Sequence, residues 1–563
     1  MNPNVREVWL HSVTAVSPTT GEAFPAEFLI RDGRIAAVAP PGGIRAPGAR
    51  PIDGGGRICV PGFVDAHMHV ESSFLSPGAF ASAVAACGTT TVAEDPHDLV
   101  NIAGVAGMAW MVAACRDLPV RILHMAPSCV PPLPGLETAL GSVGPAEVRE
   151  MLRMPGVAGL AEVMDYEAAV AGDPRIAAIV AEAVAAGVLV DGHAPGLVGA
   201  DLAAFLGLGI ESDHTVNSPE GFVERARLGA WVQLQARSAR PDVIAALHAL
   251  PVCAPLNLVT DDVAADELAA GQHLNAVAAL AVRNGMPPLD ALRAITWKPA
   301  QRLRLGDVGV LRPGARADLV VLDGELAEFR PGLVLAGGLP VGEWTPPPAP
   351  RPGPLGAGLR LPPLRADDFT WPVQAAAGPV RLRAMAVRPA DFYTAPAEVV
   401  ASVQHGLVDW EAAGLIQVAV LQRYGGGQRA RAPLAGLRLG PGAAATTYAH
   451  DTHNLVVVGT NAADMAQAAE RLRQIGGGLA IVRGGRLVAE LALPLGGVMS
   501  PLPAAEVAAA AAGVRAALLA WGYAHGNPVM SLATLSLSVS PALKLTDLGL
   551  VDVAARRLVS PLA

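Results

Sequence analysis

The chain has 563 residues, too many for one compact core, so its length predicts roughly two to four domains. Hydrophobic residues make up 52% and charged residues 16%, a composition that excludes an intrinsically disordered chain. The net charge is −9, and the sequence has no basic cluster with interleaved aromatic residues, which argues against a nucleic-acid-binding protein.

The N-terminal sequence and the cysteines indicate the compartment. The first residues, MNPNVREVWLHSVTAVSP, lack a basic segment followed by an apolar one, and later apolar stretches are interrupted before about 18 positions. We therefore expect a soluble, cytoplasmic protein without membrane contact. Five cysteines without CxxC spacing indicate reduced thiols, most of them small core residues, and Cys129 stands apart because it follows a predicted strand. They are Cys59, Cys87, Cys115, Cys129 and Cys253.

The two ends of the first half of the chain have a similar texture. Residues 1–60 alternate short β-like runs with Gly, Pro and Asp turns, which is typical of a small β domain. The same texture returns at 306–345. We therefore predict that the two segments form one small β-sandwich domain, with the residues between them inserted as a separate domain.

Residues 61–305 repeat a different unit, in which a short β-branched run precedes an Ala- and Leu-rich helical stretch. Helices are expected at 101–115 and 266–284, for example. Repeated βα units build a parallel sheet, and about 250 residues is the usual length of a (β/α)8 barrel. The sequence thus predicts an α/β protein with a TIM-like barrel inserted in the β-sandwich domain.

The last third of the chain follows a proline-rich segment. Residues 346–363 read as a linker, because proline disrupts the hydrogen bonding of helices and central strands. Beyond it, residues 364–563 carry strand-like runs and two Ala-rich helical stretches at 464–474 and 504–521. We predict a C-terminal α+β domain there.

A β-like run at the start of the predicted barrel ends in His-x-His, in Pro61-Gly-Phe-Val-Asp-Ala-His-Met-His69. Residues i and i+2 of a strand point to the same side, so His67 and His69 can face one metal ion from the rim of the barrel. Two unrelated histidines remain an alternative if this pair is considered alone.

Later strand ends carry the other residue types that a metal centre needs, in the order Glu162, His193 and His214. Imidazoles with a carboxylate suit one or two divalent ions such as Zn²⁺, Mn²⁺ or Fe²⁺, and a carboxylate can bridge two of them. A further strand end, at Asp261-Asp262, offers an acid that can accept a proton from metal-bound water. Functional groups of barrels gather at the C-terminal ends of strands, so this agreement favours a metal centre.

The order HxH, Glu, His, His, Asp resembles that of the amidohydrolase superfamily, and the surrounding sequence is similar to that of bacterial adenine deaminases. The matching segments are Pro61–Ser73, Thr89–His97, Pro127–Pro131, Gly159–Met164, Asp191–His193, Gly209–His214, Thr260–Asp262, His450–Asn461 and Leu543–Asp547. The resemblance covers nearly the whole chain apart from the proline-rich linker and the extreme ends.

This resemblance implies two divalent ions per chain, with Mn²⁺ expected first and Fe²⁺ or Zn²⁺ as alternatives. By similarity, His67 and His69 hold one ion, His193 and His214 hold the other, and Glu162 bridges them. Asp261 is a ligand and moves protons during catalysis, so Glu162 and Asp261 are the expected catalytic residues. The implied reaction is hydrolytic deamination of adenine to hypoxanthine and ammonia, a step of purine salvage, with a small molecule as the substrate. We also expect a homodimer or larger oligomer, as for many such barrels.

Four further residues near these ligands are candidates for contact with the purine or with an additional ion: Glu71, Ser72, Asp95 and His97. An Asp/His pair beside a proline can also cap the next helix, and Glu71 and Ser72 can instead support the histidines from behind. His450, Asp451, His453 and Asn454 precede a predicted strand, where they either close over the site or serve domain packing. The other histidines, which have no partner spacing, are expected to be ordinary residues: His11, His124, His248, His273, His405 and His525.

Two segments depart from the adenine deaminases. After Asp262 the chain reads Val263-Ala-Ala-Asp-Glu267 where the family usually has Arg-His-Pro. The segment Val232-Gln-Leu-Gln-Ala-Arg-Ser238 stands where the family usually has Leu-Arg-Glu-Gly-Ser, so a charged pair is missing or displaced to Arg237. Neither change removes an expected ligand. A modified purine or another cyclic amidine or amide therefore stays open as the substrate. An inactive purine-binding barrel is disfavoured because every expected ligand is present.

Overall fold

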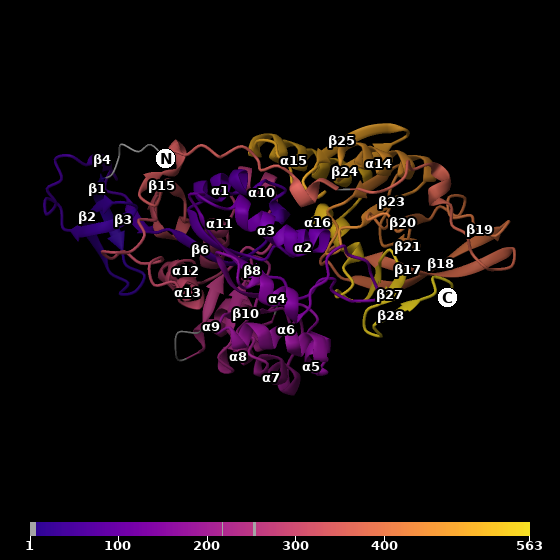
Figure 1. Cartoon of the computed structure of the whole chain (residues 1–563), viewed down its shortest axis with the longest axis horizontal. Helices are drawn as coiled ribbons and strands as arrows, with labels where there is room; N and C mark the ends of the chain where they lie inside the picture. Colours follow the sequence, from indigo (N-terminus) through magenta and orange to yellow (C-terminus); the bar gives the residue numbers. More distant parts are fainter. Residues whose placement is uncertain (1–6, 217, 251–254, 358) are drawn as a thin grey trace.

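The computed structural model describes residues 7–216, 218–250, 255–357 and 359–563. Figure 1 shows three parts along the longest axis: a small β-rich part near the N-terminus, a central part of strands and helices, and a C-terminal part. One expected core cysteine, Cys253, lies outside the described residues, whereas Cys59, Cys87 and Cys129 are buried and Cys115 is partly buried, all as free thiols.

The N-terminal part is an eight-stranded sheet that combines two distant segments of the chain. Its order is β16-β15-β14-β5-β1-β2-β3, with β4 paired to β1. The strands are β1 (Glu7–Val16), β2 (Ala23–Arg31), β3 (Arg34–Ala39), β4 (Arg50–Asp53), β5 (Ile58–Pro61), β14 (Leu319–Leu322), β15 (Pro331–Ala336) and β16 (Leu339–Pro340). Because β5 pairs with β14, the chain enters and leaves the central part at neighbouring strands.

The central part is a curled parallel sheet of the TIM-barrel type. Strands β6 to β10 pair in chain order, and so do β11 to β13. The amide of Glu211 donates to the carbonyl of Val190 between these two sheets, and a bridge between Met68 and Asp261 connects the last strand region to the first. The strands are β6 (Phe63–Met68), β7 (Thr89–Glu94), β8 (Arg121–Ala126), β9 (Val157–Val163), β10 (Leu189–Gly192), β11 (Ser212–Asp213), β12 (Trp231–Leu234) and β13 (Leu256–Leu258).

Helices follow the barrel strands, and two of the predicted long helices are each divided. The stretch 101–115 falls in α2 and α3, which meet at Gly104 with a φ of 58°, and the stretch 266–284 falls in α10 and α11, separated by a turn with Gly271 at φ 73°. Such positive φ angles favour glycine and end a helix. The helices are α1 (Pro77–Ala86), α2 (His97–Ala103), α3 (Val105–Ala114), α4 (Pro145–Met151), α5 (Tyr166–Val170), α6 (Pro174–Ala185), α7 (Gly199–Gly207), α8 (Pro219–Arg227), α9 (Pro241–His248), α10 (Ala265–Ala269), α11 (Leu274–Arg283), α12 (Pro288–Ala294) and α13 (Trp297–Arg302).

The C-terminal part is built on a nine-stranded sheet in the order β19-β18-β17-β21-β20-β23-β22-β24-β25, with a separate three-stranded sheet of β26, β27 and β28. The strands are β17 (Gly378–Val387), β18 (Thr394–Gln404), β19 (Leu407–Val408), β20 (Ile416–Leu421), β21 (Arg429–Ala435), β22 (Ala443–Thr446), β23 (Leu455–Gly459), β24 (Gly478–Arg483), β25 (Arg486–Ala492), β26 (Leu543–Leu545), β27 (Leu550–Asp552) and β28 (Arg557–Val559). The helices are α14 (Ala462–Ile475), α15 (Ala504–Trp521) and α16 (Pro528–Ala533).

Helix α15 is the one helix in the described ranges whose length and composition would allow it to cross a membrane. Its buried face includes Val507 and Trp521 and packs within the protein against β25 and α10. A helix that is apolar on most of its sides can lie in the core of a large protein or span a membrane, so composition alone does not distinguish the two.

The barrel and the C-terminal part share one hydrophobic core. Phe74, which follows β6, contacts Tyr448 of the C-terminal part edge to face, with ring centroids 4.9 Å apart. The amide of Ser500 donates to the carbonyl of Phe74 across the same boundary. The C-terminal part is therefore docked firmly over one end of the barrel, where the candidate site lies.

Candidate metal centre

His67 and His69 lie side by side at the end of β6, as the alternation of a strand requires. Both are almost fully buried, and their rings are perpendicular with centroids 5.2 Å apart. Their Nε2 atoms lie 3.4 Å and 3.2 Å from the same oxygen, Oδ1 of Asp261. The structure thus brings three of the predicted ligands to one point.

Glu162 lies between two groups of histidines. Its Oε2 is 2.6 Å from Nδ1 of His193 and 3.2 Å from Nε2 of His214. Its Oε1 faces the other side, 3.7 Å from Nε2 of His69. One carboxylate oxygen therefore faces each group, and His67 and His214 stack with ring centroids 4.0 Å apart.

The protonation of these groups follows from their contacts. Burial opposes ionisation of Glu162, but His214 and His193 outweigh it and hold the pKa of Glu162 well below its usual range. Burial also opposes ionisation of Asp261, yet His67 and His69 lower its pKa. Burial lowers the pKa of His214, which favours the neutral imidazole that metal ions bind. The centre therefore offers two carboxylates and a neutral imidazole.

The donor set fits a divalent cation. Within the described chain, Nε2 of His67 and Nδ1 of His214 are buried ring nitrogens without a hydrogen-bond partner. Nε2 of His67 is also one of the atoms that converge on Asp261. Unpaired buried polar atoms are costly, and an ion between these residues would satisfy the nitrogen of His67.

Asp191 and Arg302 support His67 from behind, and neither is among the site residues predicted from the sequence. Oδ2 of Asp191 lies 3.8 Å from Nδ1 of His67, and Arg302, on α13, donates to Oδ1 of Asp191. Burial raises the pKa of Asp191, but Arg302 and His67 outweigh burial and bring it down to about 2. An ionised carboxylate behind a ligand histidine fixes its orientation. The position of Asp191, two residues before His193, was the available sequence signal.

Gln235 is a second residue without an assigned role. It lies at the end of β12, is 5% exposed, and donates from Nε2 to Oδ2 of Asp261 over 2.6 Å. Arg237 places Nη2 3.6 Å from the same oxygen and is half-exposed. The segment that departs from the adenine deaminases thus faces the expected proton-transfer residue.

The four additional candidates divide into two pairs. Ser72 donates to the carbonyl of His69 over 2.7 Å, and Oε1 of Glu71 accepts the amide of Leu99, so both lie behind the ligands. Oδ2 of Asp95 faces Nδ1 of His97 at 3.2 Å, while the N-cap of α2 is Pro96. The capping alternative for Asp95 is therefore wrong.

A cavity of about 450 Å³ opens beside this centre. The barrel contributes Arg237 and all the expected ligands except His67, and the C-terminal part contributes the opposite wall. That wall includes Phe392, Tyr393, His450, Asp451 and His525. His450 and Asp451 therefore reach the site as well as the domain boundary, and His525, expected to be an ordinary residue, lines the same cavity.

Two other histidines expected to be ordinary have specific buried partners. Nδ1 of His124 lies 2.5 Å from Oε1 of Glu94, and Nδ1 of His273 lies 2.9 Å from the hydroxyl of Thr89. Burial lowers the pKa of His273 to about 3, so this ring is neutral. His124 and His273 lie outside the cavity lining.

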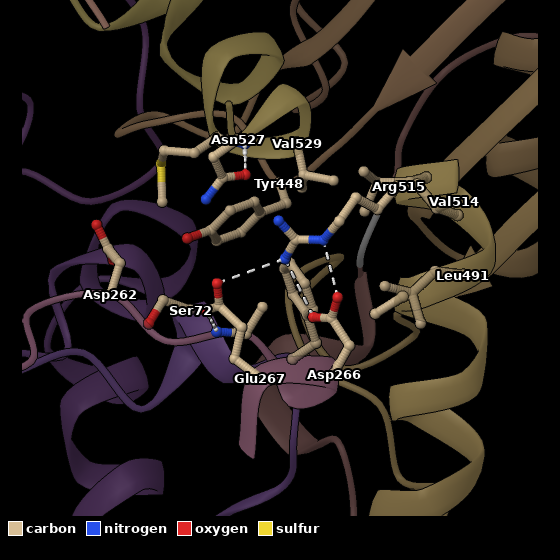
Figure 2. Close-up of a pocket in the computed structure, with 15 residues that line it drawn as sticks. Ser72, Asp262, Asp266, Glu267, Tyr448, Leu491, Val514, Arg515, Asn527 and Val529 are labelled. Carbon is tan, nitrogen blue, oxygen red and sulfur yellow. Dashed lines mark hydrogen bonds and ion pairs between the residues drawn. The ribbon is translucent and has the colours of Figure 1, made fainter. Parts of the chain in front are cut away.

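The segment after Asp262 connects the site to the C-terminal part (Figure 2). In this view Arg515 of α15 reaches Asp266 and Glu267 of α10, Asp262 lies at the left, and the ring of Tyr448 lies between Asp262 and Arg515. Nε and Nη2 of Arg515 lie 2.8 Å and 3.2 Å from the two carboxylate oxygens of Asp266. The residues that replace the family's usual sequence therefore form an ion pair between domains.

Residues 58–338 match the Amidohydrolase family, and residues 391–557 match the Adenine deaminase C-terminal domain. The barrel with its centre thus defines a metal-dependent hydrolase of the amidohydrolase class. The chain is 36% identical over 552 residues to an adenine deaminase 2 of Shouchella clausii, covering 96% of both chains. It is 39% identical over 563 residues to an adenine deaminase of Klebsiella pneumoniae, covering 97% of this chain and 92% of that one. The chain belongs to the adenine deaminase family.

Proposed function

We propose that this protein hydrolyses adenine to hypoxanthine and ammonia. One observation carries the proposal. A single cavity is lined on one side by the carboxylates and imidazoles of the barrel and on the other by residues of the segment that matches the Adenine deaminase C-terminal domain. The relatives named adenine deaminase match nearly the whole chain, which favours adenine over a modified purine or another cyclic amidine.

The proposed centre holds two divalent ions, with Mn²⁺ as the first candidate. His67, His69 and Asp261 would hold one ion, His193 and His214 the other, and the two oxygens of Glu162 face both groups. When bound, such ions lower the pKa of a water ligand toward about 7 and so supply hydroxide at neutral pH.

The protein's own groups then position the ring and move protons. Oδ1 of Asp261 lies 3.2 Å from His69, and Oδ2 is held by Gln235, so this carboxylate has a fixed direction toward the centre. As a proton acceptor it would take the proton of the attacking water and pass it to the amino group of adenine. The C6–N bond breaks, ammonia leaves, and water supplies the oxygen of hypoxanthine. Phe392, Leu537 and Val539, apolar side chains that the C-terminal part adds to the cavity, would help to exclude bulk water from this exchange.

The domain organisation also remains a proposal. The sheet shared by β1 to β5 and β14 to β16 supports a β domain of 1–60 with 306–345 into which a hydrolase barrel of 61–305 is inserted. Residues 346–363 would then be the linker to the C-terminal domain of 364–563. We also propose assembly as a homo-oligomer and a place in purine salvage.

An ammonia-release assay tests the activity. Mn²⁺-loaded protein is supplied separately with adenine, N6-methyladenine, guanine, cytosine and dihydropyrimidines. We expect ammonia from adenine, and a lack of turnover of adenine with turnover of another compound would overturn the proposal.

The Glu162→Gln and Asp261→Asn variants test the two catalytic roles. Each should lower kcat for adenine at least about 100-fold, because general acid–base groups contribute this much or more. Thermal unfolding and metal analysis establish that the variants fold and how much metal they keep. An active Asp261→Asn enzyme would refute the proton-transfer role.

A further inference from the structure

A second cluster of imidazoles and carboxylates lies where the barrel meets the C-terminal domain. His97 and Asp98 begin α2 in the barrel, and His450 and Asp451 follow β22 in the C-terminal domain. All four residues are at most 6% exposed. The proposed deamination uses none of them as a ligand or a proton carrier, so their burial needs another explanation.

Three of the side chains, His97, Asp98 and His450, each place a ligand atom within 4.8 Å of the other two, and Asp451 lies beside His97 and His450. Nε2 of His97 lies 3.1 Å from Oδ1 of Asp98 and 3.7 Å from Oδ1 of Asp451. Nδ1 of His450 lies 3.6 Å and 3.3 Å from the same two oxygens. A tetrahedral ion with bonds of about 2.0–2.2 Å separates its ligand atoms by about 3.3–3.6 Å. The four observed distances bracket this range.

Hydrogen bonds account for only some of these polar atoms. Among the residues that the structure describes, Nε2 of His97, Oδ2 of Asp98 and Oδ2 of Asp451 are buried without a hydrogen-bond partner. Nε2 of His97 and Oδ1 of Asp98 are close enough for a hydrogen bond but are not aligned as donor and acceptor. A buried polar atom without a partner is costly, and a cation between His97 and Asp98 would satisfy the ring nitrogen and balance the carboxylate charge.

The remaining contacts of the two imidazoles leave the required nitrogens free. Nδ1 of His97 faces Oδ2 of Asp95 at 3.2 Å, so Nε2 is the nitrogen that faces Asp98. A carboxylate on the second ring nitrogen is usual for histidines that bind metal. Nε2 of His450 pairs with the hydroxyl of Tyr448 at 3.0 Å, so Nδ1 faces the cluster.

His453 supports the cluster as a neighbour of Asp98. Its Nδ1 accepts the amide hydrogen of Ala449 over 3.2 Å, so the neutral ring carries its hydrogen on Nε2. That nitrogen lies 2.7 Å from Oδ1 of Asp98. A protonated ring nitrogen cannot bind a metal ion, so we leave His453 out of the ligand set.

We propose that His97, Asp98, His450 and Asp451 bind a further divalent transition-metal ion, distinct from the catalytic centre. Two carboxylates balance the charge of the ion, and mixed imidazole and carboxylate ligands suit Mn²⁺, Fe²⁺ or Zn²⁺. Each domain supplies two ligands, so the ion joins the C-terminal domain to the barrel. His97 separates the two sites, with Nδ1 on the side of Glu162 at 4.0 Å and Nε2 in the new site.

Anomalous diffraction from Mn²⁺-loaded crystals of the wild-type protein tests the position. Data collected above and below the manganese absorption edge should give a peak between the four side chains, in addition to the peaks of the catalytic centre. Peaks at the catalytic centre alone would overturn the proposal. This measurement needs no variant and no substrate, so its outcome is independent of whether adenine is deaminated.

Metal content measured by plasma mass spectrometry tests the ligands. Asp98→Asn should bind one equivalent of Mn²⁺ per chain fewer than wild type. Asp547→Asn is the matched control, because Asp547 is a buried carboxylate at the same domain boundary that accepts from the amide of Thr138. It should keep the wild-type content. Equal content in wild type and Asp98→Asn would overturn the proposal, and His450→Gln serves if Asp98→Asn fails to fold.

Discussion

Gln235 orients the carboxylate of Asp261, the expected proton-transfer residue. Its amide holds Oδ2 of Asp261, which leaves Oδ1 directed at His67 and His69. The donor to this oxygen is a neutral amide, and the nearby guanidinium of Arg237 lies farther away, with Nη2 at 3.6 Å. A neutral donor orients the carboxylate but adds less to its acidity.

We predict that Gln235→Leu lowers kcat about 10-fold with little change in KM, because Asp261 loses its orientation while the cavity stays open. Gln235→Arg, which restores a donor, should retain most of the activity. Steady-state kinetics with adenine and the bound Mn²⁺ of each variant are the measurements. If Gln235→Leu matched wild type, or if Gln235→Arg failed equally, a positioning role would be wrong.

At the scale of elements, β26 supports the loop that lines the cavity. Lys544 of β26 is fully buried and donates from Nζ to the carbonyls of Phe392 and Thr534. Burial lowers the pKa of Lys544 to about 7, with Asp391 opposing the shift. The chain's only lysines are Lys298 and Lys544, and a lysine, unlike arginine, can lose its charge inside a protein.

This buried amine predicts a pH dependence of stability. The unfolded chain keeps a lysine pKa near about 10.4, so the unfolded state binds the proton more tightly than the folded state. Protonation of Lys544 therefore leaves the free energy of unfolding unchanged above about pH 10.4. This free energy decreases as the pH falls from there toward about 7, and it stays at the lower level at more acidic pH. The change is at most about 1.4 kcal/mol for each pH unit.

The variant Lys544→Met isolates the effect. The melting temperature of wild type minus that of Lys544→Met should increase from pH 7 to pH 9. Arg557→Met is the control, since Arg557 is an exposed cationic side chain on β28 of the same small sheet. A difference that is flat or decreases with pH would contradict the assignment.

For the whole molecule, the docking of the C-terminal domain completes the site. Phe74 and Tyr448 meet across the boundary, and Arg515 binds Asp266 with side chains only 22% and 14% exposed. The segment after Asp262, which departs from the usual family sequence, is therefore occupied in holding the domains together. Substrate contact does not have to explain that departure.

A double-mutant cycle with Arg515→Leu and Asp266→Asn tests this coupling. A two-bond, partly buried ion pair should give a coupling free energy of about 1 kcal/mol between the two positions. Denaturant unfolding of wild type, both single variants and the double variant provides the four values. Additive effects would mean that the pair contributes nothing to docking.

Helix boundaries show how local and long-range information divide. The alanine-rich pattern of 504–521 predicts one helix, and the structure confirms it as α15, which continues through Gly513. The stretches 101–115 and 266–284 also predict single helices, yet each is divided, at Gly104 and near Gly271. Glycine in a helix-like pattern is tolerated in one context and ends the helix in another, so tertiary packing made the choice.

The sequence by itself determined the class of the protein, the repeated βα units and the order of the expected ligands, because each depends on a short pattern. A strand that ends in His-x-His carries both histidines to one side wherever it lies. Only the tertiary structure placed Gln235 on Asp261, Asp191 behind His67, and the pair His97 and Asp98 against His450 and Asp451. Those contacts join residues far apart in the chain, and no local periodicity encodes which loop ends will meet when two domains dock.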